Sequence, residues 1–232
     1  MEIKEKQKKT KEEVLEIVVV VLMGLVILLT ACATWIGSLH GGNQATNYTK
    51  SNNIAADGNA RWNQAAQSLM SDMQLVDRIN DIRIELTYAE DNGHMEEAEK
   101  LQWKIDEIVN NSASDELIEA IQWADEQEEY ASPFDMEGFV DSYFEDAEAV
   151  LAEADEVLKQ GQEDNANGDA FGLVMVIYSI VLFLLGISSS FKNEKNKQAL
   201  IIIGVVGTVL ATVYMLTLPL PTGFSLSSFF GS

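Results

Sequence analysis

Three runs without a charged side chain limit what this chain can fold into. They cover residues 17–36, 171–188 and 199–218. Each run is close to the roughly 17–25 residues that a helix needs to cross the hydrocarbon core of a bilayer. No segment alternates over any length with the two-residue period of a strand. We therefore predict an all-α membrane protein with three transmembrane helices.

The segment between the first two runs, residues 37–170, is strongly acidic. It holds 31 Asp and Glu against seven Lys and Arg, a net charge of -24, whereas the whole 232-residue chain carries -22. Such a charge disfavours nucleic acid and anionic lipid surfaces as partners of this segment. We expect no nucleic-acid partner. The expected partners are membrane lipid, further copies of the chain, and a protein that binds the acidic segment.

Two short lysine-rich segments predict the orientation in the membrane. Residues 1–16 contain five lysines, and residues 189–198, between the second and third runs, contain three. Short basic flanks stay in the cytoplasm, while long domains cross largely regardless of charge. We predict a protein of the cell (plasma or inner) membrane with residues 1–16 and 189–198 inside and residues 37–170 and 219–232 outside. Prolines end the last span and aromatic side chains suit the interface: Pro219, Pro221, Phe224, Phe229 and Phe230.

The sequence LTAC at 29–32 has the form of a lipobox, after which a signal peptide is cut and Cys32 is acylated. Two features favour an uncut anchor instead. Acidic residues are mixed with the N-terminal lysines, and the apolar run continues past Cys32 to Trp35, which is placed like an interfacial anchor. We favour the anchor, and lipidation of Cys32 is the alternative. As Cys32 is the only cysteine, the exported segment contains no disulfide.

Residues 37–170 have the apolar spacing of a helical domain. Gly37, Gly41 and Gly42 weaken a helix after the first span, yet residues 43–67 have no proline and could resume it, and EDNG at 90–93 predicts its end. A second helix follows from Met95, and Ser114 is placed to cap a third. We predict an antiparallel helical bundle or coiled coil.

A fourth helix is expected to begin at Ser132-Pro133, a capping residue followed by proline. It carries a seven-residue repeat typical of a helix in a coiled coil or bundle. The sequence GQEDNANGD at 161–169 then suggests a flexible neck before the second span. The repeat is formed by Met136, Val140, Tyr143, Ala147, Val150, Ala154 and Val157.

The sequence contains no recognisable constellation for catalysis. Its two histidines, His40 and His94, are not paired with a plausible nucleophile, and we expect no enzyme activity, cofactor or metal site. Residues 163–168 resemble half of an EF-hand loop, but Val174 stands where the bidentate glutamate is required. We interpret the acidic clusters as solvated helix faces, with a divalent-cation sensor as an alternative.

Small and polar residues suggest two further roles. In the third span, a small-residue stripe permits close helix packing, formed by Gly204, Gly207, Thr208 and Ala211. Around the end of the first span, polar residues suit either a wet juxtamembrane helix, which we prefer, or the lining of a pore or an oligomer contact. These are Thr34, Asn43, Gln44, Asn47, Thr49, Asn52 and Asn53.

Three stretches carry a family resemblance: ACATWIGSLHGGNQATNYTKSNNIAADGNARWNQA, ASPFDMEGFV and GDAFGLVMVIYSIVLFLLGISSS. They resemble a family of uncharacterised bacterial three-pass membrane proteins. The resemblance implies one anchor, a helical exported domain and a two-span hairpin, and it supplies no catalytic residues. It also weakens the hypothesis that Cys32 is lipidated, because in the family the Ala-Thr-Trp run that follows Cys32 belongs to the anchor. The matching positions are Ala33, Thr34, Trp35, Gln44, Ala45, Tyr48, Ala55 and Ala56.

These features favour a structural or interaction protein: a homo-oligomer that presents an acidic helical domain outside the cytoplasm. The first alternative is a channel or channel-accessory subunit, with the first span and residues 43–53 around the pore. The second is a sensor that responds to divalent cations.

Overall fold

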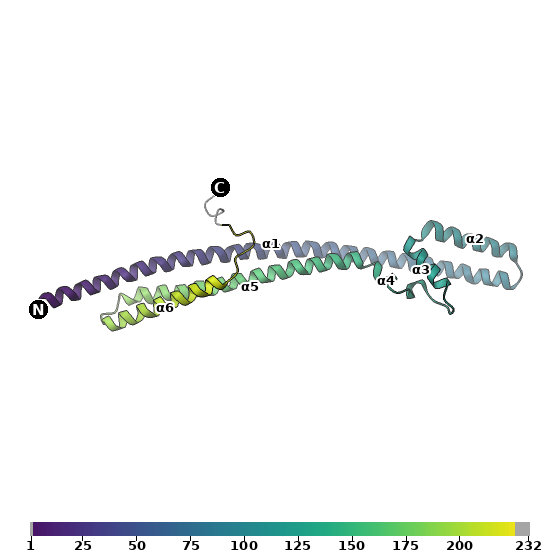
Figure 1. The fold of residues 1–232 in the computed structure, drawn as a ribbon. Coiled ribbons are helices and arrows are strands. Elements are labelled where there is room, and N and C mark those ends of the chain that lie inside the picture. The colour runs from purple at the N-terminus through teal and green to yellow at the C-terminus, as the bar shows by residue number, and fades with distance from the viewer. Residues whose placement is uncertain (1, 226–232) are drawn as a thin grey trace. The chain divides into compact units, whose positions relative to one another are not determined.

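The computed structural model describes residues 2–225, so Phe229 and Phe230 lie outside the described residues. The described chain contains helices and no strand, which confirms the all-α prediction (Figure 1). Three of its helices, α1, α5 and α6, are long and apolar enough to cross a membrane, in agreement with the three predicted spans. The elements are α1 (Glu2–Asp91), α2 (Met95–Ser112), α3 (Asp115–Asp125), η1 (Pro133–Asp135), α4 (Phe139–Ser142), α5 (Glu145–Ser188) and α6 (Glu194–Thr217).

The chain divides into two compact units. Unit 1 is formed by the chain up to Lys50 and from Glu156 onward, and unit 2 is formed by Ser51–Asp155. Helix α1 has no break over its 90 residues, so the first apolar run does not end at a helix boundary. No proline interrupts residues 37–89, and the helix runs through Gly37, Gly41 and Gly42, which were expected to weaken it.

Unit 1 packs α1, α5 and α6 around one apolar core. On α1 the buried positions recur every seven residues, at Val19, Val26 and Ala33. These positions form the α1 seam, the line along which one face of the helix stays in contact with its neighbours. Side chains of α5 and α6 complete the core, namely Phe171, Val174, Tyr178, Val181, Leu185, Ile201 and Ala211. Outward-facing side chains of the same spans are large and apolar, including Val20, Leu28, Phe183 and Leu210. This distribution suits helices surrounded by hydrocarbon.

Two polar contacts show how the three helices of unit 1 run. At one end, Nζ of the buried Lys197 at the start of α6 lies 3.6 Å from Oε1 of Glu16 on α1. At the other end, His40 of α1 contacts Asp164 of α5 and Pro219 just after α6. Helices α1 and α6 are therefore parallel, and α5 is antiparallel to both.

The small residues of α6 lie against α5. A methyl group added at Gly204 would come within 2.9 Å of Leu185 Cδ2, and one added at Gly207 within 2.8 Å of Val181 Cγ2. Thr208 and Ala211 are buried beside them, and the Thr208 hydroxyl donates to the Gly204 carbonyl. The stripe thus allows α6 to approach α5 within one chain.

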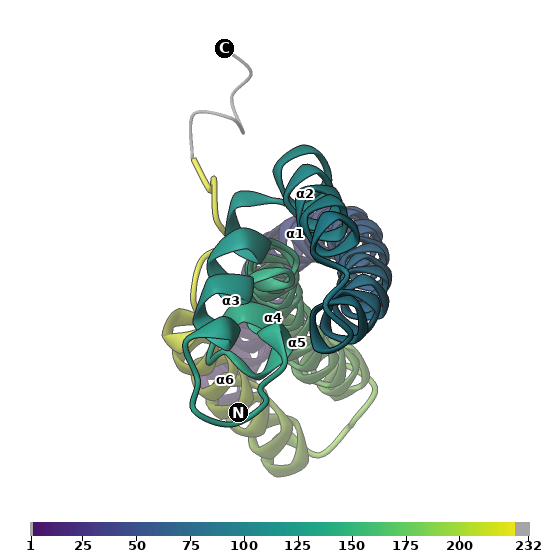
Figure 2. The same ribbon diagram turned by 90° about the vertical axis from the view of Figure 1, so that its right-hand side faces the viewer.

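Unit 2 packs the end of α1 against α2, α3 and α4. Figure 2 shows α2 beside the blue, C-terminal turns of α1. The helix α1 ends at Asp91, as predicted, and Gly93 turns the chain with a φ of 71°. The Ser114 hydroxyl accepts from the Leu117 amide and caps α3, also as predicted. The core contains Val76, Ile79, Ile82, Ile105, Leu117, Ala120, Ile121 and Phe139.

The predicted start of the fourth helix is wrong. Ser132 and Asp135 form a capping box, but it closes a single 3-10 turn, η1. The chain then passes through Gly138, whose φ of 80° is left-handed, and the long helix α5 begins only at Glu145. The predicted repeat holds within α5, where Ala147, Ala154 and Val157 are buried.

The predicted neck at 161–169 is also wrong, because α5 runs through it without a break. Packing explains the difference. The backbone at Gly161 lies so close to α1 that an added methyl group would be 2.5 Å from Tyr48 Cδ1. Similarly, the non-helical part of the predicted 189–198 loop is short, because Asn193 caps α6 by accepting from the Lys195 amide.

We predict that Gly161→Ala destabilises unit 1, since the new methyl group would overlap the Tyr48 ring. Overpacking of this kind costs about 1–3 kcal/mol, which exceeds the roughly 1 kcal/mol by which alanine is favoured over glycine inside a helix. The Tm of the full-length protein in detergent should fall by several degrees. Gly172→Ala is the matched control, because an added methyl group there meets no atom within 4 Å. Equal Tm values for the two variants would contradict this packing.

Candidate functional site: a buried polar centre at His40

The fourth position of the α1 seam is polar. His40 follows Ala33 by seven residues and is 1% exposed. Its ring stacks on Phe171 of α5, with 5.8 Å between centroids and 27° between planes. A buried imidazole is costly unless its ring nitrogens are hydrogen-bonded. The hydrogen-bond partners of its two ring nitrogens therefore determine which protonation states of His40 the site can hold.

Both ring nitrogens of His40 have partners, and the partners come from different segments. Nδ1 lies 2.7 Å from Oδ1 of Asp164 on α5, and Nε2 lies 3.1 Å from the carbonyl oxygen of Pro219, after α6. The other carboxylate oxygen of Asp164 accepts from Nδ2 of Asn47 at 3.3 Å. Asn47 lies one heptad after His40 on α1. Asp164 is itself buried, with a side chain 12% exposed. The centre ties together α1, α5 and the segment after α6.

The segment after α6, residues 218–225, makes further contacts with α1. Nδ2 of Asn43 donates to the Thr222 carbonyl at 3.2 Å, and the Trp35 and Phe224 rings lie 5.3 Å apart. Pro221 is buried. This segment therefore lies along α1 from Trp35 to Asn43, with the Pro219 carbonyl aimed at His40.

The predicted pore-lining residues lie on different faces of α1. Asn43 and Asn47 bond within the chain, as described above, and Gln44 is half-buried. The Thr34 hydroxyl donates to Thr30 and lies 2.9 Å from Sδ of Met175. Thr49 donates to the Ala45 carbonyl and is exposed, as are Asn52 and Asn53. A pore lined by this set stays a prediction.

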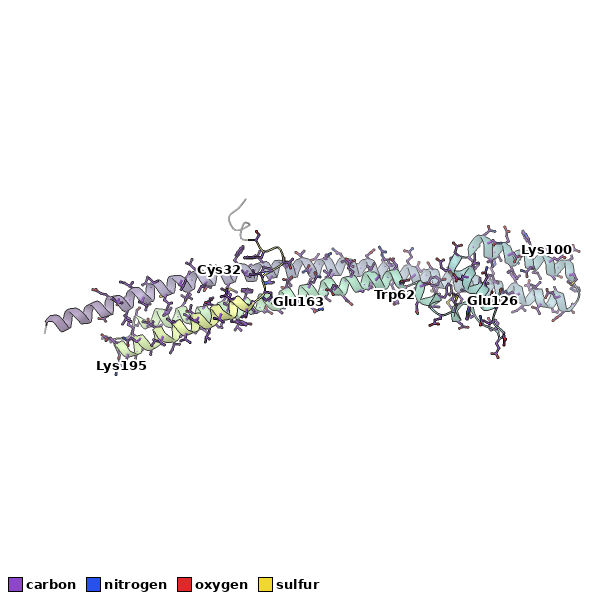
Figure 3. All side chains as sticks on the ribbon, in the orientation of Figure 1. Cys32, Trp62, Lys100, Glu126, Glu163 and Lys195 are labelled. Atoms are coloured by element: carbon purple, nitrogen blue, oxygen red, sulfur yellow. The ribbon has the colours of Figure 1, made fainter. Side chains whose placement is uncertain are left out.

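Cys32 is exposed on the uninterrupted helix α1 (Figure 3). Its lipidation stays a prediction, as does the metal-free interpretation of the acidic clusters. Among the residues that the structure describes, no group of three or more His, Cys, Asp or Glu is arranged to hold a metal ion.

The pairing of His40 with Asp164 was not predicted, although two signals for it were present. The buried series of α1, continued by one heptad from Ala33, reaches His40. On α5, the series Leu185, Tyr178, Phe171 continued by one heptad reaches Asp164. Two polar residues at successive seam positions of two long helices are a specific reason to expect a buried pair.

A second polar contact lies in unit 2. The Tyr143 hydroxyl donates to Oδ2 of Asp72 on α1 at 2.5 Å. Partial burial, the hydrogen bond to this carboxylate and the negative charges of Asp72 and Glu116 raise the pKa of Tyr143 well above its ordinary value of 10.0. The phenol therefore stays protonated in the folded state when free tyrosines ionise.

The fold defines a class, an all-helical protein with three helices able to cross a membrane. Beyond this class, no protein-family model, no curated protein and no solved structure matches the chain. Membership of the bacterial three-pass family therefore stays a prediction.

The raised pKa of Tyr143 predicts a loss of stability at alkaline pH. The stabilisation is fully present below about pH 10, where unfolded tyrosine begins to ionise, and is lost as the pH rises further. Between pH 8 and about pH 11, Tyr143→Phe should therefore lose a few degrees less in Tm than the wild type. Tyr130→Phe, at an exposed site, is the matched control for loss of a tyrosine hydroxyl. Identical slopes for the wild type and Y143F would exclude this contribution.

Proposed function

We propose that the protein is a structural or interaction protein of the bacterial cell membrane. It crosses the membrane three times and presents unit 2 as an acidic helical bundle outside the cytoplasm, as a homo-oligomer. No catalytic role is proposed. The observation that carries the proposed topology is the contact between Lys197 and Glu16, at 3.6 Å.

The Lys197–Glu16 contact supports the topology because it joins the two lysine-rich segments. Glu16 ends the segment 1–16, and Lys197 belongs to the segment 189–198. Lysine-rich flanks are retained in the cytoplasm, so one membrane face suits both segments. The opposite end of unit 1, with His40 and Pro219, then faces the outside. In the sequence, unit 2 begins at Ser51, eleven residues after His40.

The charge of unit 2 supports an interaction role. Residues 51–155 carry 27 acidic and five basic side chains. Few of the acids are neutralised within the unit, and the ion pairs there, such as Arg61 with Asp146 and Arg83 with Asp125, are exposed. Such surface pairs contribute little to stability. The remaining negative field attracts basic protein surfaces and repels nucleic acid.

The exposed face of the first span is the surface at which we propose self-association. In one chain α1 exposes apolar side chains along much of its first span, among them Val20, Val21, Leu25 and Leu28. Lipid or the same span of another copy would cover this surface. In the membrane, close packing between helices rather than hydrophobicity decides between the two.

The topology is tested with single cysteines in a Cys32→Ser background. Glu126→Cys lies in unit 2 and Lys195→Cys at the start of α6 (Figure 3). A thiol reagent that cannot cross membranes, added to intact cells or spheroplasts, should label E126C at once and K195C only after permeabilisation. The C32S parent shows the background. Labelling of K195C in intact cells, with E126C protected, would contradict the proposed orientation.

The homo-oligomer is tested by the molar mass of the full chain in mild detergent, measured by light scattering with the detergent mass subtracted. We expect a defined multiple of 25.6 kDa. A monomer across the accessible concentration range would remove self-association from the proposal, while leaving the topology intact.

A further inference from the structure

We propose that His40, Asp164 and the Pro219 carbonyl form a proton-binding site that holds residues 218–225 on α1. The segment is docked when the His40–Asp164 pair holds its proton and is released when the proton leaves. This inference depends on contacts within unit 1 and not on which side of the membrane they face.

The proton is required because His40 faces two acceptors. Nδ1 points at the Asp164 carboxylate at 2.7 Å and Nε2 at the Pro219 carbonyl at 3.1 Å. A neutral imidazole carries one N–H and can therefore donate only once. Both bonds form when the imidazole is protonated on both nitrogens, or equally when the shared proton sits on the carboxyl group. In either form the pair holds one proton more than a neutral histidine beside a carboxylate.

Loss of that proton acts on the Pro219 contact. The remaining N–H stays on Nδ1, because a hydrogen bond to a carboxylate is stronger than one to a carbonyl. Nε2 then presents a lone pair to the Pro219 oxygen, so that two acceptors face each other where the buried His40 ring meets the exposed residue Pro219. An unpaired buried acceptor is costly. The segment retains the bond from Asn43 to Thr222 and the ring contact of Trp35 with Phe224, both at its periphery.

The groups that contact His40 leave Asp164 as the residue with which it shares the extra proton. From α5, Asp164 is the titratable group bonded to His40, and Phe171 covers one ring face. The segment 218–225 contributes a backbone carbonyl at this point. From α1, Asn47 contributes a neutral amide, which bonds to Asp164 and fixes the carboxylate. Within the described residues, no other charged side chain is bonded to His40.

The substitution Asp164→Asn separates a proton-dependent site from an ordinary buried pair. An asparagine amide can donate to Nδ1 of a neutral His40, whose single proton then sits on Nε2 and bonds to Pro219. Its carbonyl oxygen can still accept from Asn47. All three hydrogen bonds form without the extra proton. D164N should therefore keep residues 218–225 docked after the wild type has released them.

The experiment places a nitroxide at Thr222→Cys in a Cys32→Ser background of the full-length protein, since the Thr222 side chain is exposed and its segment docked. Spectra from about pH 5 to about pH 9 bracket the ordinary range of imidazole. In the C32S parent with Asp164, the ratio of mobile to immobile label should rise at least about tenfold. In D164N it should stay constant. Asp169→Asn, an exposed carboxylate further along α5, is the matched control and should respond like the parent.

Nitrogen-15 NMR of labelled histidine reports the ring protons of the same samples without the nitroxide. His94 is exposed and serves as the internal reference. The rise in label mobility should follow the loss of the proton from Nε2 of His40, which both docked forms carry, and not a change at His94. The proposal is overturned if the segment stays immobile across the range, if D164N releases it as the parent does, or if D164N is mobile at every pH. It is also overturned if Nε2 of His40 carries no proton while the segment is docked.

Discussion

The seam of α1 is the feature on which unit 1 depends. Val19, Val26, Ala33 and His40 are buried at intervals of seven residues, so one face of a long helix stays against its partners. Within hydrocarbon, apolar side chains gain nothing from leaving water, and helices associate through close packing and hydrogen bonds. The first three positions supply packing. The fourth position is His40, a buried polar side chain that needs hydrogen-bond partners. It finds them on α5 and in the segment after α6.

Local signals in the sequence predicted local structure well. The apolar runs predicted three helices able to cross a membrane, and Ser114 and Gly93 marked real helix boundaries because capping and left-handed turns depend on a few neighbouring residues. Predictions failed where distant packing decided the outcome. Ser132 and Pro133 start only one turn, and Gly161 lies within a continuous helix because Tyr48 fills the space of its missing side chain.

The polar centre required information that single segments do not contain. His40 and Asp164 are 124 residues apart, and their pairing depends on the register of α1 against α5. The Pro219 carbonyl carries no side-chain signal at all, because any residue at that position offers a backbone oxygen. Heptad continuity could have suggested the pair, whereas the third partner follows only from the path of the chain after α6.

The central proposal is that α1 remains on the chain as the first of three spans. The first seam positions, Val19 and Val26, and the Lys197–Glu16 contact all depend on residues 1–31. The intact mass of the protein, purified from a bacterial membrane and measured under denaturing conditions, tests this claim most directly. The account predicts a mass near the 25.6 kDa of the full sequence. A chain that begins at Cys32 and carries added lipid would contradict it, since residues 1–31, with Val19 and Val26, would then be absent from unit 1.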